Sequence, residues 1–445
     1  MAATLAVVDD FRGWATRIAA RVRSLIARCR PWLCKAMPAK PGLHLCNRLP
    51  EVAMTTFVGI DVAKDTHWAC ALDAGGRVLL QRAVPNTQAG LDALSVELRA
   101  MPTPIRVGLD VDGSIATFLQ ALLLADGLDL VHVPGLAVNR AAHGYAGGER
   151  KSDPQDARVI ADLVRTRDGL RPIRPDDEAT ASLRLLVSRR RDLVQDQVRR
   201  MSRLRQMLSQ VHPGLEAKLD ITNKSSLALL TRYVTPAEIS KASTKAIVRH
   251  LRRTPNLRGP EQLADLARNC AAQQRIAVPG EAMTARLVRE MATEAMLVRE
   301  RLILLDKELE VIIGAHPQGA LVRSLPGMGA VLAAEFIAAI GDIARFRSPA
   351  ALAAAAGLAP VLRQSGHSRT LRRARRGDRD LKRILYQAAF CAFTNHDVSR
   401  AYYDRKRREG KHHVQAVIAL ARQRSNVLWA ILTHNAPYDP SHRLA

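Results

Sequence analysis

The stretch that decides the fold is TTFVGIDVAKDTHWACALD, residues 55–73. An apolar, β-favouring run ends on the carboxylate of Asp61, and a second, alternating run follows it. The pattern predicts a strand at about 56–62 that opens an antiparallel meander. An acid at the end of such a strand is well placed to hold a metal ion.

The residues that follow predict further strands and helices in alternation. We expect strands at about 67–73, 77–84, 105–111 and 128–133, and helices at about 87–100, 114–125, 136–143 and 154–167. The Gly75-Gly76 pair predicts a two-residue hairpin connection, and Asn86 and Thr87 are candidate caps of the first helix. The order β-β-β-α-β-α-β-α is that of an RNase H-like (RuvC-like) α/β fold.

Four acids fall where this order would bring them together. Asp61 and Asp110 end strands that are neighbours in such a sheet, and Asp153 and Asp156 lie on one turn at the start of the last helix. Clustered carboxylates repel one another unless a divalent cation lies among them, and oxygen ligands suit Mg²⁺. We therefore expect these four acids to hold Mg²⁺ for phosphodiester chemistry. Taken singly, Asp153 is better explained as a helix N-cap and Asp156 as an acid that complements the helix dipole; the conjunction of the four acids favours the metal site.

Composition restricts the class of partner. The chain has 445 residues, 47% of them hydrophobic, which is enough for two to three domains with real cores. Its formal net charge of +25 predicts a polyanionic partner or an acidic surface, and nucleic acid is favoured over a membrane or an acidic protein. A general arginine bias is the alternative. The six cysteines show neither zinc-ligand spacing nor a disulfide framework, so we expect a reducing cytoplasm. No apolar run reaches the roughly 18 to 20 residues of a membrane span.

The chain divides into four segments by composition. Residues 1–53 break into prolines, and we expect them to be a mostly disordered extension upstream of a functional start at Met54. Residues 54–170 are the expected RNase H-like domain. Residues 171–315 are an expected helical, coiled-coil spacer, and residues 316–445 are a mostly helical C-terminal domain.

Two long helices are expected in the spacer. The first runs from Leu183 to Val211, and its expected seam comprises Val194, Val198, Met201, Leu208 and Val211. The second has apolar positions that alternate by three and four: Val288, Met291, Ala295, Val298, Leu302, Leu305, Leu309 and Ile312. We expect the two helices to pair. Arg199 and Arg203 are among the many arginines of the first, which indicate nucleic-acid contact or a solvated face.

The C-terminal domain begins with Leu-Pro-Gly-Met-Gly at 325–329, followed by an apolar helix. This pattern resembles a helix-hairpin-helix, in which backbone N–H groups near Gly327 and Gly329 would bind a phosphate. A plain turn between two helices is the alternative.

Four motifs together resemble one known family. GIDVAK at 59–64, GLDVDG at 108–113, ERKSDPQDARVIADL at 149–163 and SPAALAAAAGLAPVLRQSGHSRTLRRARRGDRDLKRILYQAAF at 348–390 are similar to those of the DEDD transposases of the insertion-sequence one-ten family, the bridge-RNA-guided serine recombinases. The resemblance implies that Asp61, Asp110, Asp153 and Asp156 are the four acids and that Ser365 is the nucleophile, with Ser368 as the neighbouring alternative. One departure is plain: the family usually has Glu followed by Thr-Gly at the second motif. Either the backbone compensates for the shorter acid, or Asp112, expected on the same strand face as Asp110, takes or shares its role.

The resemblance also implies partners. These are donor and target DNA, a structured non-coding bridge RNA, and further copies of the chain in a dimer or tetramer, in the bacterial cytoplasm at the nucleoid. The residues we expect to bind nucleic acid are Lys64, Lys151, Arg199, Arg203, Gly327, Gly329, Arg363, Arg369, Arg372, Arg373, Arg375 and Arg376.

The sequence thus predicts a Mg²⁺-dependent transposase that cleaves and transfers DNA strands. Two other functions stay open. One is an RNase H-like resolvase or nuclease that uses metal-activated water, and the other is a non-catalytic nucleic-acid-binding remnant.

Overall fold

The computed structural model describes residues 55–145, 152–174, 178–366, 368–374 and 377–440. The expectations for residues 1–53, Lys151, Arg375 and Arg376 lie outside these ranges.

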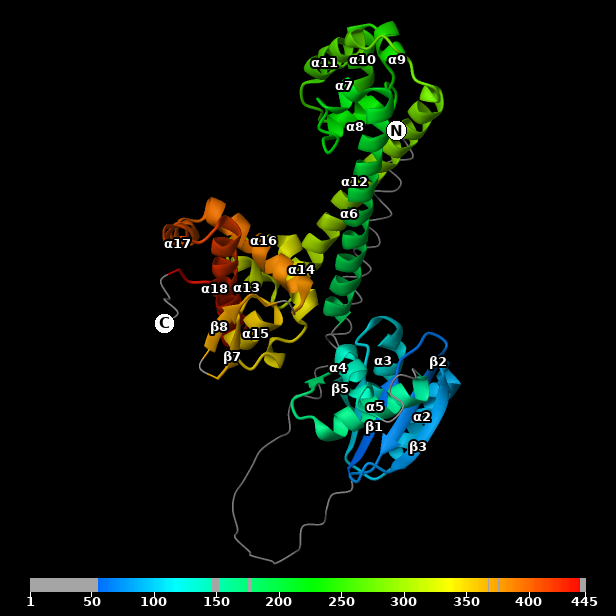
Figure 1. Cartoon of the computed structure of the whole chain (residues 1–445), viewed down its shortest axis with the longest axis vertical. Coiled ribbons are helices and arrows are strands. Elements are labelled where there is room, and N and C mark those ends of the chain that lie inside the picture. The colour runs from blue at the N-terminus through cyan, green and yellow to red at the C-terminus, as the bar shows by residue number, and fades with distance from the viewer. Residues whose placement is uncertain (1–54, 146–151, 175–177, 367, 375–376, 441–445) are drawn as a thin grey trace, which may run out of the picture. The chain divides into compact units, whose positions relative to one another are not determined.

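A six-stranded mixed sheet forms the N-terminal part (Figure 1). Its strands are β1 (Thr56–Asp61), β2 (Thr66–Leu72), β3 (Val78–Pro85), β4 (Ile105–Leu109), β5 (Asp129–His132) and β6 (Arg171–Pro172). They lie in the order β3-β2-β1-β4-β5-β6, with β1 antiparallel to β2 and parallel to β4. This arrangement is compatible with the expected RNase H-like fold, and it makes β1 and β4 central neighbours.

Helices cover both faces of the sheet. They are α2 (Gln88–Arg99), α3 (Thr117–Ala125), α4 (Gly135–Ala142) and α5 (Asp153–Thr166). Val58 and Ile60 of β1 belong to the same buried cluster as Leu91 and Leu119, from α2 and α3. The expected cap Thr87 accepts a hydrogen bond from the Gly90 amide through its hydroxyl (3.2 Å). Every element expected between residues 56 and 167 is present within a few residues of its expected bounds.

Three local expectations were wrong. The expected strand at 105–111 ends at Leu109, because the chain turns away from the sheet at Asp110. The expected two-residue hairpin connection is longer, since the Asp73 amide bonds the carbonyl of Arg77 and places three residues between them. Arg171–Pro172, which fall at the start of the expected helical spacer, instead pair antiparallel with β5 and extend the sheet.

Two glycines let α5 lie directly on the sheet. A Cβ added at Gly59 would lie 2.2 Å from the amide nitrogen of Ala161 and 2.3 Å from the carbonyl oxygen of Ala157. At Gly108, the neighbouring position on β4, it would lie 2.3 Å from a methyl group of Val164. Only hydrogen fits at these positions, so the sequence brings the start of α5 close to the ends of β1 and β4.

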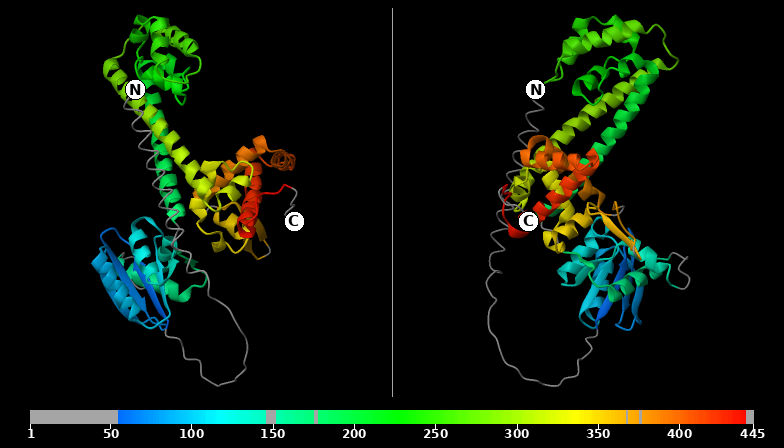
Figure 2. Two further views of the ribbon diagram at one scale, coloured as in Figure 1. Left: turned by 180° about the vertical axis from the view of Figure 1, so that it is seen from behind. Right: turned by 60° about the vertical axis from the view of Figure 1, so that its left-hand side comes forward.

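Two long helices run side by side in the helical remainder (Figures 1 and 2). They are α6 (Glu178–Val211) and α12 (Glu281–Ala315), and they are antiparallel, because Arg190 pairs with Asp306 while Arg200 pairs with Glu294. Between them in sequence lie the short helices α7 (Pro213–Glu216), α8 (Lys224–Leu230), α9 (Pro236–Lys241), α10 (Thr244–Leu251) and α11 (Pro260–Gln273). The expected pairing of the two long helices is therefore present.

The expected seam of α6 was partly wrong. Val198 is 61% exposed, whereas Leu193 and Leu204 are buried. In the middle of the pair, α12 is contacted by polar residues instead: Gln197 donates a hydrogen bond to the carbonyl of Ala295 (3.1 Å). Because polar residues occupy contact positions, apolar periodicity alone does not identify the face of α6 that packs on α12.

The C-terminal part is mostly helical. Its elements are α13 (Gly319–Ser324), α14 (Ala330–Ile340), α15 (Pro349–Ala355), β7 (Val361–Ser365), β8 (Ser368–Arg372), α16 (Arg379–Asn395), α17 (Asp397–Arg408) and α18 (His413–His434). Phe336 on α14 is fully buried in a core that also holds Leu385 of α16 and Leu428 of α18. The hairpin β7-β8 is exposed along both strands.

Candidate active site

The loop after Asp61 is held by hydrogen bonds from three directions. The Val62 amide donates to a carboxylate oxygen of Asp110 (3.2 Å), and the Ala63 amide donates to Nδ1 of the buried His67 (3.2 Å). Asn86 donates from its side chain to the carbonyl of Lys64 (2.9 Å). Ile60 and Leu109 are partners in the parallel ladder, and Asp61 and Asp110 are the residues that follow them. The two acids therefore lie at the ends of adjacent strands.

Asp110 and Asp156 are close enough to interact electrostatically. Burial raises the pKa of Asp110 above its usual value, the Val62 amide opposes that rise, and the negative charge of Asp156 adds to it. A carboxylate that is costly to ionise beside a second carboxylate is stabilised by a cation.

Asp112 has a different partner. Its carboxylate forms an ion pair with Arg171 of β6, and it lies 3.4 Å from the side-chain nitrogen of Gln120. Although burial alone would raise the pKa of Asp112, the charge and hydrogen bond of Arg171 hold it below its usual value. The expectation that Asp110 and Asp112 share a strand face was wrong, because the alternation of faces ends with β4 at Leu109.

Both remaining acids lie in the first turn of α5. The N-cap is Ser152, so the alternative interpretation of Asp153 as the N-cap was wrong; Asp153 occupies the first helical position and is exposed. Asp156 is half-buried on the same turn. Gly59 and Gly108 bring this turn towards Asp61 and Asp110.

The donor set suits a hard divalent cation, since all four side chains offer carboxylate oxygens. In the ranges that the structure describes, however, no three His, Cys, Asp or Glu side chains are gathered closely enough to hold a metal ion. The donor type fits Mg²⁺, and Asp110 and Asp156 interact electrostatically, but the four-carboxylate site stays a prediction.

His132 is a neighbour of this site that the sequence interpretation missed. It pairs with Leu109 at the end of β5, and its ring interacts with the backbone of Asp110. Burial lowers the pKa of His132, and the charge of Arg171 lowers it further. Its position at the end of the strand next to β4 was a signal that could have found it.

Ser365 is the last residue of β7 and is exposed. It pairs with Ser368 across the turn of the hairpin, and Gly366 in that turn has a φ of 55°. Leu362 and Leu371 face each other on the same hairpin and are 53% and 70% exposed. An exposed hairpin with apolar side chains on its surface is suited to contact another molecule.

The basic residues expected to bind nucleic acid fall into three settings. Arg363, Arg369, Arg372 and Arg373 are exposed on or beside the hairpin. On α6, Arg199 forms an ion pair with Asp196 of its own helix, and Arg203 is exposed, as is Lys64 after β1. Their contacts with nucleic acid stay predictions.

The two glycines of the Leu-Pro-Gly-Met-Gly turn differ in their surroundings. Gly327 has a φ of 82°, and a Cβ there would lie 2.6 Å from the carbonyl oxygen of Ala388 in α16, so packing between helices already accounts for it. Gly329 is exposed and is the N-cap of α14, where the first backbone N–H groups have no partner within the helix. A phosphate contact at Gly329 stays a prediction.

Comparison with known proteins places the chain in a family. A family model described as Transposase matches residues 58–213, which include the four acids, and a model described as Transposase IS116/IS110/IS902 family matches residues 319–404, which include Ser365. The 44.8 kDa protein of insertion element IS116 from Streptomyces clavuligerus is 38% identical over 387 residues, covering 86% of this chain and 96% of that protein. The chain belongs to the IS116/IS110/IS902 family of transposases.

Other relatives of this transposase agree. The 42 kDa protein of insertion element IS900 from Mycobacterium paratuberculosis is 38% identical over 88% of this chain and 98% of its own length. The pilin gene-inverting protein of Moraxella bovis is 29% identical over 142 residues, which cover 30% of this chain and 44% of that protein. The family resemblance expected from the motifs is therefore confirmed. No helix in the described part of the transposase is long and apolar enough to cross a membrane.

Proposed function

We propose that this transposase moves its insertion sequence by Mg²⁺-dependent cleavage and transfer of DNA strands, with Ser365 as the nucleophile and Asp61, Asp110, Asp153 and Asp156 as the metal ligands. Two features of the one chain carry the proposal: carboxylates at the ends of β1 and β4 and at the start of α5, and an exposed hairpin that bears Ser365 and several arginines.

In the proposed reaction, the Ser365 hydroxyl oxygen attacks the phosphorus of a DNA phosphodiester. A bond from serine oxygen to phosphorus forms as one phosphorus–oxygen bond to sugar breaks, the serine loses its proton, and the departing sugar oxygen gains one. Bound Mg²⁺ would polarise the phosphate and stabilise charge on its oxygens. Arg363 and Arg369 lie on the same hairpin as Ser365, where guanidinium groups would stabilise that charge as well.

The remaining features follow from the family resemblance. The exposed hairpin supports an active site completed by a second protomer, in a dimer or tetramer. A non-coding bridge RNA pairs with donor and target DNA, and the assembly works at the bacterial nucleoid. Sequencing the RNA that co-purifies with the protein tests this part; recovery of only random cellular RNA would contradict it.

The chemistry is tested by trapping the covalent intermediate. The full chain is incubated with labelled DNA and Mg²⁺, then denatured, and the adduct is measured for the wild type, Ser365→Ala and the matched control Ser368→Ala. The adduct should form with wild type and Ser368→Ala and be absent with Ser365→Ala and Asp61→Ala. An adduct that survives Ser365→Ala would overturn the serine assignment, and free hydrolysed ends without any adduct would select a nuclease that uses water.

A further inference from the structure

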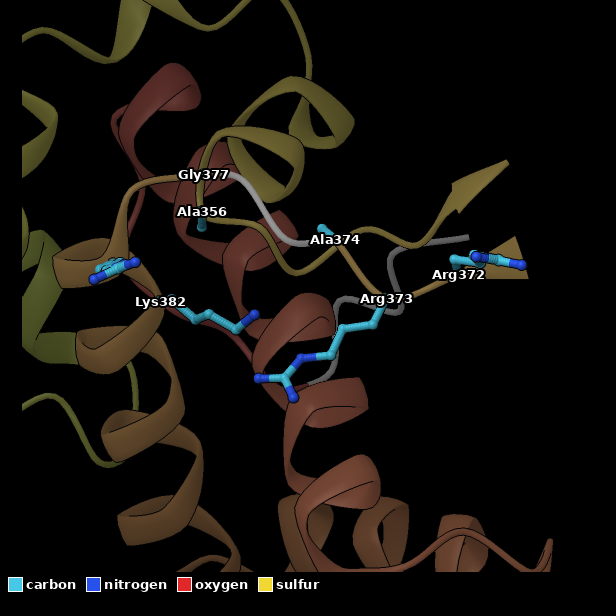
Figure 3. A pocket seen from close by; sticks show the side chains of 7 residues that line it. Ala356, Arg372, Arg373, Ala374, Gly377 and Lys382 are labelled. Carbon is cyan, nitrogen blue, oxygen red and sulfur yellow. The ribbon is translucent and has the colours of Figure 1, made fainter. Parts of the chain in front are cut away.

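A pocket of about 750 Å³ opens beside the base of the β7-β8 hairpin (Figure 3). Its described lining comprises Ala356, Arg372, Arg373, Ala374, Gly377, Arg379 and Lys382. Four of these side chains are cationic and none is acidic. A pocket with this lining favours an anion.

The floor of the pocket is fixed by close backbone packing. A Cβ at Gly377 would lie 2.6 Å from the amide nitrogen of Gly357, and the φ of Gly377 is 118°. The next residue, Asp378, donates its amide to the carbonyl of Ala355 (2.7 Å). Gly377 and Asp378 are thereby held against the end of α15, so this side of the pocket is part of the folded domain.

The carboxylates that the structure describes do not pair with the cations of the pocket. Within the described ranges, no Asp or Glu lies within ion-pair distance of Arg372, Arg373, Arg379 or Lys382. Other arginines nearby are paired: Arg191 binds Asp380 (2.6 Å) and Arg383 binds Glu335 (2.8 Å). The domain thus neutralises neighbouring cations and leaves those of the pocket for an external anion.

Lys382 and Arg373 extend into the pocket from opposite sides, one from α16 and the other from the end of β8 (Figure 3). The ammonium group of Lys382 donates to the carbonyl of Gly357 (3.0 Å), which anchors it at the floor. Burial lowers the pKa of Lys382, and the positive charge of Arg373 lowers it further. An anion between the two groups would relieve their repulsion.

The position of the pocket relative to Ser365 is set by the hairpin. At the base of the hairpin, Arg372 of β8 pairs with Val361 of β7. Ser365 lies four residues beyond Val361 on β7. At about 3.4 Å per residue in an antiparallel strand, the separation is roughly 14 Å. Neighbouring phosphates of one DNA strand are about 7 Å apart along the backbone and about 3.4 Å apart along the helix axis, so this separation spans about two to four nucleotides.

We propose that this pocket binds one backbone phosphate of the DNA strand that Ser365 attacks, about two to four nucleotides from the attacked phosphodiester, and that Lys382 is the residue that positions it. The inference rests on the function proposed above. Binding there would set which phosphodiester faces Ser365, because the hairpin is a fixed spacer between the two points. DNA is favoured over RNA because the pocket and the nucleophile share one short hairpin.

The test measures DNA binding by the full chain carrying Ser365→Ala, so that cleavage does not interfere. Single uncharged methylphosphonates replace the phosphates one at a time, up to eight nucleotides on each side of the cleavage site. One position, about two to four nucleotides from that site, should weaken binding on the order of tenfold, as expected for loss of a charge-assisted hydrogen bond.

The same scan with Lys382→Met added should lose that sensitivity, so that the variant binds both DNAs equally, and Lys382→Arg should restore it. Arg373→Met changes an exposed side chain of the same pocket, so it serves as a second test if Lys382→Met folds poorly, and it should lose the same sensitivity. The matched control is Lys307→Met on α12, an exposed lysine far along the chain from the pocket, which should keep the full pattern.

Equal sensitivity in Lys382→Met and the parent protein, or no sensitive position at all, would overturn the proposal. The assignment to DNA would be overturned if neutral linkages in the DNA had no effect and neutral linkages in a synthetic copy of the co-purified RNA weakened binding. Failure of the serine assignment is distinguishable, because it would appear as an adduct that survives Ser365→Ala and would leave this binding measurement unchanged.

Discussion

Replacing Gly59 with alanine tests how the fold builds the acidic site. The new Cβ would lie 2.2 Å and 2.3 Å from backbone atoms of Ala161 and Ala157, whereas ordinary contact begins near 3.4 Å. Helix α5 must therefore retreat from β1 by about 1 Å, and backbone atoms have no rotamer with which to give way. Overpacking of this kind costs about 3 kcal/mol.

The displacement should also impair the reaction. Helix α5 carries Asp153 and Asp156, so a retreat of this size moves both carboxylates away from Asp61 and Asp110. A misplacement of about 1 Å at a reacting centre costs roughly a hundredfold in rate. We expect Gly59→Ala to lose about that factor in recombination.

The assays are hydrogen exchange of the β1 and α5 amides, which reports local stability, and recombination in vitro. Gly135→Ala is the matched control, because a Cβ at Gly135 would meet nothing within 4 Å; it should match the wild type in both assays. Exchange in Gly59→Ala that equals the wild type would refute the close packing of α5 on β1.

Three further predictions concern single residues. Because the pKa of Asp110 is raised on folding, the native state holds its proton more tightly than the unfolded state, and stability falls as pH rises above the ordinary value of 3.8. Asp110→Asn should therefore unfold at a higher temperature than wild type at pH 7 without metal, and a pH series of melting curves should show that this gain is lost below about pH 4. The same variant should fail in recombination. Asp112→Asn should cost about 1 kcal/mol or less in denaturant unfolding through its pair with Arg171 and keep recombination within threefold, and loss of recombination would instead make Asp112 the second acid. Gly377→Ala should cost about 3 kcal/mol in unfolding through its close backbone contact, while Gly410→Ala, with positive φ but open space around it, should cost about 1 kcal/mol, and equal costs would contradict the fixed pocket floor.

The sequence by itself determined much of this protein. Apolar periodicity and turn residues predicted the elements between residues 56 and 167, because those signals are local. The motifs around Asp61, Asp110, Asp153 and Ser365 were sufficient to indicate the family, since each motif is a short run of neighbouring residues.

Only the tertiary structure decided contacts between distant residues. It separated Asp110, which receives the Val62 amide, from Asp112, which is held by Arg171, and no local pattern distinguishes two acids two residues apart. It also showed that the face of α6 that contacts α12 differs from the predicted apolar seam, because polar side chains occupy contact positions. It placed Arg373 and Lys382 in one pocket. It also explained why residue 59 is glycine, since α5 packs where a side chain would be. Both features depend on segments that meet only in the folded chain.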